Sequence, residues 1–143
     1  LHRISRHPIE DGKLSCTSCH NPHGSTGERM LTGNTVNETC FQCHAEKRGP
    51  FLHEHAPVTE SCLTCHKPHA STYEKLLTLR KPLLCQQCHS NPRHPGTIYA
   101  RRQDQIGQPL YGVQTGRLFG MSCSNCHMQI HGTNHPAGKM LNR

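Results

Sequence analysis

A five-residue pattern, Cys-x-x-Cys-His, sets the tightest limit on what this chain can fold into. It occurs five times among the 143 residues and accounts for all ten cysteines. Two cysteines at this spacing, followed at once by a histidine, form the attachment pattern of c-type haem. A redox dithiol or half of a zinc site needs no histidine at that position. Five complete copies therefore favour covalently bound haem over both alternatives.

Each motif predicts a role for its two cysteines and for its histidine. We expect both sulfur atoms to form thioether bonds to one haem, and the histidine to bind the iron as the proximal axial ligand. The predicted attachment residues are Cys16, Cys19, Cys40, Cys43, Cys62, Cys65, Cys85, Cys88, Cys123 and Cys126. The predicted proximal ligands are His20, His44, His66, His89 and His127. The predicted cofactors are thus five c-type haems, and no catalytic residue is predicted.

The first four motifs lie in two copies of a longer repeat. Each copy, residues 7–44 and residues 55–89, contains in order a histidine, a motif, a Pro-His pair and a second motif. A period in this range is typical of structural units that stack on one another. The sequence therefore predicts one domain over residues 1–143. Its parts are two di-haem units at 7–50 and 55–95, then an arm and the fifth haem at 96–143.

Nine histidines lie outside the motifs and are candidates for the distal axial ligands. His7 and His55 each stand a few residues before the first motif of a repeat. We therefore expect them to fold over the haems of Cys16 and Cys62, respectively. An iron with imidazole at both axial positions has no site open to a substrate, which favours electron transfer over catalysis.

The other distal candidates follow a motif. His23 and His69 stand too close to the preceding proximal histidine to reach the opposite face of the same haem. We expect each of them to bind the haem of the second motif in its own repeat. For the fifth haem, His94 is the first candidate, and His135 and His131 are the alternatives.

The composition leaves little material for an ordinary hydrophobic core. Hydrophobic residues make up 32% of the chain, which has three Phe, three Tyr and no Trp. Such a chain cannot offset its conformational entropy by burying its own side chains, so we expect the haems to form the apolar interior. The predicted fold class is a multihaem cytochrome c: mostly irregular coil with short α-helices wrapped around a row of five covalently bound haems, and little or no β-sheet.

Local signals predict where the helices form. Ser25-x-x-Glu28 and Ser71-x-x-Glu74 each precede an apolar pair, and Ser-x-x-Glu is the capping-box pattern of a helix start. We therefore expect a short helical turn after each serine. Residues 40–47 are expected to form a short helix that carries the second haem.

The charge and the cofactor together constrain partners and location. The formal net charge is +7, which we interpret as neutralising the haem propionates. The Lys and Arg residues are scattered and lack interleaved aromatic residues, so no nucleic-acid partner is predicted. No apolar run is long enough for a transmembrane helix. Because c-type haem is attached outside the cytoplasm, the predicted location is periplasmic, outer-membrane-associated or extracellular.

Four segments carry a resemblance to a known family. They are Cys16-Thr-Ser-Cys-His-Asn-Pro-His-Gly24, Cys40-Phe-Gln-Cys-His-Ala-Glu-Lys-Arg-Gly-Pro-Phe51, His55-Ala-Pro-Val58 and Cys123-Ser-Asn-Cys-His-Met-Gln-Ile-His-Gly-Thr-Asn-His-Pro136. The chain resembles the MtrA/DmsE/PioA family of decahaem periplasmic cytochromes, which sit in a porin–cytochrome conduit of the bacterial outer membrane. Family members carry ten motifs, so five motifs correspond to about half of one. More loosely, the chain is similar to the pentahaem donors of periplasmic nitrite reductase.

The resemblance implies electron transfer through a row of bis-histidine haems, in periplasmic or outer-membrane electron transport, and no enzymatic activity. The implied partners are a periplasmic donor and an outer-membrane porin, outer-surface cytochrome or terminal reductase. Two alternatives stay open. A multihaem reductase would keep one haem without its distal ligand, and a haem-filament subunit would assemble with copies of itself.

Overall fold

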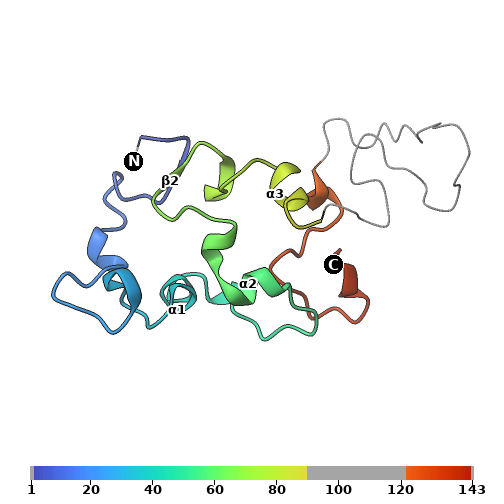
Figure 1. Cartoon of the computed structure of the whole chain (residues 1–143), viewed down its shortest axis with the longest axis horizontal. Coiled ribbons are helices and arrows are strands. Elements are labelled where there is room, and N and C mark those ends of the chain that lie inside the picture. The colour runs from blue at the N-terminus through green and yellow to red at the C-terminus, as the bar shows by residue number, and fades with distance from the viewer. Residues whose placement is uncertain (1, 90–121, 143) are drawn as a thin grey trace, which may run out of the picture.

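The computed structural model describes residues 2–89 and 122–142, and these form an elongated arrangement of loops and short helices (Figure 1). Its α-helices are α1 Val36–Phe41, α2 Ala56–Glu60 and α3 Leu83–Gln86. Single 3₁₀ turns occupy Cys16–Ser18, Glu28–Met30, Ala45–Lys47, Cys62–Thr64, Glu74–Leu76, Cys123–Asn125 and Gly138–Met140. None of the described helices is both long and apolar enough to cross a membrane. The predicted fold class, coil with short helices, is confirmed.

The one sheet among the described residues joins the start of the chain to the second repeat. Strand β1 (Ser5–Arg6) pairs antiparallel with β2 (Ala70–Ser71), and Ser5 lies opposite Ser71. The Ser5 hydroxyl also accepts a hydrogen bond from the Leu76 amide at 2.8 Å. The segment just before the first repeat is therefore packed against the second repeat at this point.

The described part of the chain has almost no hydrophobic core. Leu77 is its only buried hydrophobic residue, whereas Ile4 is 87% exposed and Leu52 is 62% exposed. Ordinary domains bury many apolar side chains in one contiguous cluster, and this burial is their main source of stability. The fold therefore needs an apolar partner that the side chains do not supply.

The expected short helical turns form as single 3₁₀ turns, but Ser25 and Ser71 do not cap them, so the capping-box prediction is wrong. Ser25 and Ser71 each donate their hydroxyl to a carbonyl six residues further on, at Leu31 and Leu77. The residues after them form a single kinked 3₁₀ turn rather than an α-helix. The serines therefore close a loop, and the reason is that the hydroxyl finds a carbonyl acceptor across the turn.

The helix expected over residues 40–47 is also displaced. Helix α1 begins four residues earlier, at Val36, and ends at Phe41, just inside the motif. The Thr35 side chain caps its start by accepting a hydrogen bond from the Glu38 amide at 3.1 Å. This satisfies one of the unpaired amides at the helix start and explains why the helix begins there.

The C-terminal segment returns to the middle of the chain. His53 and Thr133 exchange two backbone hydrogen bonds, of 2.9 and 3.0 Å. The side chain of Asn134 also accepts a hydrogen bond from the Leu52 amide at 2.8 Å. As a result, residues 131–135 lie beside the segment that leads into α2, which Figure 1 shows as red and green ribbons close together.

Candidate haem-binding site

All five motifs adopt the same local turn. In each, the amide of the motif histidine donates to the carbonyl of the first cysteine, four residues earlier, at 2.9 to 3.0 Å. The pairs are His20 with Cys16, His44 with Cys40, His66 with Cys62, His89 with Cys85 and His127 with Cys123. This turn groups two sulfur atoms and one imidazole at each motif, as covalent haem attachment requires.

The first three motifs follow one another in space. Burial, followed by the nearby Cys40, raises the pKa of the Cys19 thiol. A side-chain hydrogen bond between Cys40 and Cys62 raises the pKa of Cys40 and lowers the pKa of Cys62 to about 7. Interactions of this kind need neighbouring thiols, so the second motif lies between the first and the third.

Neighbouring thiols also link the third motif to the fourth, and the fourth motif to the fifth. Burial, followed by the nearby Cys88, raises the pKa of the Cys65 thiol. Burial, followed by the nearby Cys123, raises the pKa of Cys85 to about 11. The five motifs therefore form a row in the order of the sequence. These shifts describe free thiols, because a cysteine sulfur in a thioether bond no longer titrates.

Four of the five motif histidines face a second histidine from elsewhere in the chain. The ring centroids are 6.1 to 6.3 Å apart, and in three pairs the rings are within 26° of parallel. The pairs are His44 with His7, His20 with His69, His89 with His55 and His66 with His131. Each pair joins one motif histidine to one histidine outside the motifs.

The spacing of these pairs fits two imidazoles on opposite sides of one metal ion. A metal–nitrogen bond to imidazole measures about 2 Å, so two such bonds and half of each ring place the centroids roughly 6 Å apart. Among residues 2–89 and 122–142, His, Cys, Asp and Glu side chains do not gather in groups of three or more as a candidate ion site. The histidines meet in twos, as bis-histidine haem requires.

Hydrogen bonds fix the orientation of several of these rings. The Nδ1 atoms of His20 and His66 lie 2.9 Å from the carbonyls of Arg29 and Lys75, respectively. His7 Nδ1 lies 2.6 Å from the carbonyl of Pro68. Since a carbonyl can only accept, Nδ1 carries the proton and Nε2 keeps its lone pair for a metal.

Two of the histidines outside the motifs are held in the neutral form. Burial, followed by the nearby His89, lowers the pKa of His55, and its Nδ1 atom is buried without a hydrogen-bond partner. Burial, followed by the nearby Lys47, lowers the pKa of His131. Neutral imidazole is the form that binds metals, so both side chains fit an axial role.

Comparison with known proteins identifies a family that carries these motifs. The family model of the doubled CXXCH motif matches residues 7–49 and 55–94. The chain belongs to the doubled-CXXCH family. Its paired motifs indicate covalently bound c-type haem. The chain is also 51% identical over 146 residues to the multiheme cytochrome MtrA of Shewanella baltica strain OS185. That alignment covers 100% of this chain and 42% of the relative's length.

The structure brings several of these histidines to motif histidines other than the expected ones. His7 and His55 face the second motif histidine of their repeat, not the first. His69 faces His20, in the preceding repeat, and not His89. The physical reason is long-range packing: it brings His7 and His55 to the second motif of their own repeat, and it brings His69 to the first motif of the preceding repeat.

The remaining candidates for distal ligands are His23, His94, His131 and His135. His131 was an alternative for the fifth haem, but it faces His66 of the third motif. His23 makes no ring contact with a motif histidine among the described residues, whereas His44, its expected partner, faces His7. His135 Nδ1 accepts a hydrogen bond from the Ala137 amide at 3.1 Å. His94 lies outside the described residues.

Proposed function

We propose that this chain transfers electrons along a row of five c-type haems, each held by one motif and bound by two histidines. The observation that carries this proposal is the set of four facing histidine pairs. A c-type haem supplies reversible one-electron chemistry at its iron when bound. The chain's own residues attach it covalently, orient its axial ligands and bring neighbouring sites close together.

The proposed ligand set follows the geometry. The motif cysteines form the thioether bonds, and the motif histidines are the proximal ligands. We assign the distal ligands as His69 for the Cys16 site, His7 for the Cys40 site, His131 for the Cys62 site and His55 for the Cys85 site. His94 remains the proposed distal ligand of the Cys123 site. Filled axial positions leave no iron open to a substrate, which supports a carrier over a reductase.

The same repeat suggests a role for His23. His69 and His131 each follow a motif by a few residues, and each faces the first motif histidine of the preceding unit. His23 holds the equivalent place in the first repeat, is exposed, and lines an open pocket of about 570 Å³ beside His20. We assign His23 as a distal ligand for a haem of a preceding doubled-CXXCH unit, so that the row extends beyond this chain.

The proposed organisation is that predicted from the sequence: di-haem units at 7–50 and 55–95, then an arm and the fifth haem at 96–143. The likeness to a multiheme cytochrome supports redox proteins as partners. We propose a periplasmic donor and an outer-membrane porin, outer-surface cytochrome or terminal reductase, and a periplasmic or outer-membrane-associated location. Because the basic residues would neutralise the haem propionates, the positive charge does not indicate a nucleic-acid partner.

Protein-film voltammetry of the mature chain distinguishes a carrier from a reductase. We expect reversible uptake and release of five electrons per chain, because every iron is held by two histidines. Adding nitrite or a sulfur oxyanion is expected to leave the current unchanged. A sustained catalytic current with any of these substrates would show an open haem and would replace the carrier by the reductase.

A further inference from the structure

A left-handed turn lies beside three of the motif histidines. Arg29 and Met30 have φ values of 55° and 56°, Lys75 and Leu76 have 53° and 57°, and Leu141 has 57°. Residues other than glycine adopt this conformation rarely, because it strains the backbone. Strain of this kind persists only where the surrounding structure fixes it, so the turn needs an anchor.

The turn brings a backbone carbonyl to the imidazole of the motif histidine. In the second repeat, the Lys75 carbonyl lies 2.9 Å from His66 Nδ1. The Lys67 amide donates to the neighbouring Leu76 carbonyl at 2.7 Å and aligns the turn with the motif. The first repeat shows the same arrangement, with Arg29 beside His20. The strained residues are therefore those that orient the axial ligand.

A buried serine holds the two ends of this turn together. The Ser71 hydroxyl donates to the Leu77 carbonyl at 2.5 Å and accepts from the Tyr73 amide at 3.0 Å. Ser71 is 1% exposed, and Leu77 is the buried hydrophobic residue of the described chain. A hydroxyl with both a donor and an acceptor satisfied in a buried position is costly to remove, since both backbone groups lose their partner.

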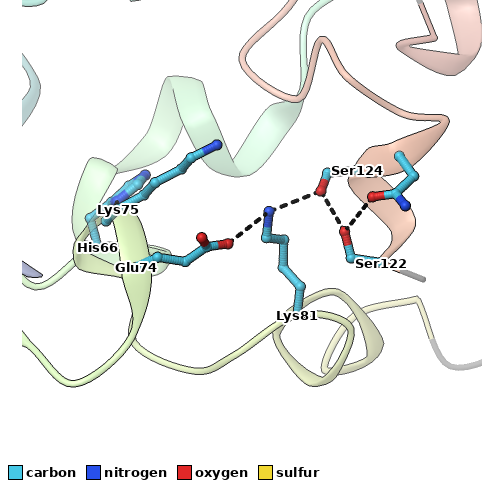
Figure 2. Close-up of polar contacts among 7 residues, drawn as sticks. His66, Glu74, Lys75, Lys81, Ser122 and Ser124 are labelled. Atoms are coloured by element: carbon cyan, nitrogen blue, oxygen red, sulfur yellow. Dashed lines mark hydrogen bonds and ion pairs between the residues drawn. The ribbon is translucent and has the colours of Figure 1, made fainter. Parts of the chain in front are cut away.

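Lys81, which lies outside the turn in sequence, makes a second contact to it. Lys81 donates to the Ser124 hydroxyl at 2.9 Å and lies 3.6 Å from a Glu74 carboxylate oxygen. Figure 2 shows Lys81 between Glu74 of the turn and Ser124 of the fifth motif. The Glu74 side chain is 71% exposed. Because an ion pair with an exposed partner contributes little to stability, the buried serine is the main anchor.

We propose that Ser71 is a positioning residue that tunes the haem of the Cys62 site through His66. It holds the strained turn, and the turn holds the Lys75 carbonyl on His66 Nδ1. A hydrogen bond from Nδ1–H makes the opposite nitrogen a stronger donor, which stabilises ferric over ferrous iron. The inference rests on the proposed haem ligation. Ser25, with the same contacts to Leu31 and the Gly27 amide, has the same role at the Cys16 site.

The test compares S71A with the wild-type mature chain by spectropotentiometry. We expect one haem of the five to shift to a more positive reduction potential while all haems stay attached and low-spin. In the reduced, diamagnetic protein, the His66 Nδ1 proton should exchange faster with solvent in an NMR measurement. The matched control is T72V, which removes a hydroxyl from the exposed neighbouring residue. Its potentials should equal those of the wild type.

Either of two results would overturn the proposal. Potentials and proton exchange in S71A that equal those of T72V would overturn it. If S71A fails to mature, S25A replaces it, because Ser25 is exposed, and the shift should then appear at the Cys16 haem. An absence of any shift in S25A would overturn the proposal equally. Failure of the proposed function is separate, since it would show as high-spin haem in the wild-type chain.

Discussion

Without haem, this chain is expected to show no cooperative unfolding transition. Leu77 is the only buried hydrophobic residue among those described, so the polypeptide cannot offset the entropy of ordering its own loops. The expected loss is the entire folding free energy, on the order of 5–15 kcal/mol for a domain of this size. This loss can be measured by circular dichroism as a function of temperature, on a chain produced without haem attachment.

The control is the same chain with its haems attached, which should retain a defined transition. The haem-free chain should show the far-ultraviolet spectrum of a disordered polypeptide at all temperatures. A sharp transition in that chain would contradict the claim that the cofactors form the interior.

Replacing His69 by alanine is expected to convert one haem from low-spin to high-spin, and that haem should be the one at Cys16. The reason is the facing pair of His69 and His20, whose ring centroids are 6.1 Å apart. Low-temperature EPR of the oxidised variant would show the new signal. Added imidazole should abolish it by filling the empty axial position. Proteolysis followed by spectroscopy of the haem peptides would place the change.

The matched control for this variant is H23A, which changes the equivalent histidine of the first repeat. In the 143-residue chain it should leave every haem low-spin, because His23 contacts no motif histidine among the described residues. In a chain that includes a preceding unit, H23A should convert one haem of that unit. A high-spin signal from the Cys40 haem in H23A would contradict the assignment of His7 to that site.

The sequence predicted the grouping of the two cysteines and the histidine within each motif, but it misplaced the short helices and did not predict which histidines face one another. The motif spacing was sufficient to predict the turn that groups Cys62, Cys65 and His66, since this turn depends only on adjacent residues. The partner of His66 depends on how the C-terminal segment packs against residues 51–55, and no local pattern encodes that packing. His131 was therefore predicted as an alternative ligand of the fifth haem, whereas its ring faces His66 of the third motif.

The serine that recurs in both repeats has a role that the sequence did not predict. Ser25 and Ser71 recur at equivalent positions, and the Ser-x-x-Glu pattern favoured a helix cap. In the structure they close strained turns that bring the carbonyls of Arg29 and Lys75 to motif histidines. Backbone carbonyls have no side-chain signature, so only the recurrence of the serines could have indicated a shared role.

The most direct test of the account is the spin state and axial ligation of all haems in the oxidised wild-type chain. Low-temperature EPR with near-infrared magnetic circular dichroism reports both, and a pyridine haemochrome assay gives the haem count. We expect five haems, all low-spin with bis-histidine signatures, four through the facing pairs and the fifth through His94. A high-spin haem at the Cys123 site would remove His94 as its ligand, whereas a high-spin haem at any other site would contradict the facing pair assigned there. Two or more high-spin haems would contradict the facing histidine pairs and the electron-transfer function proposed from them.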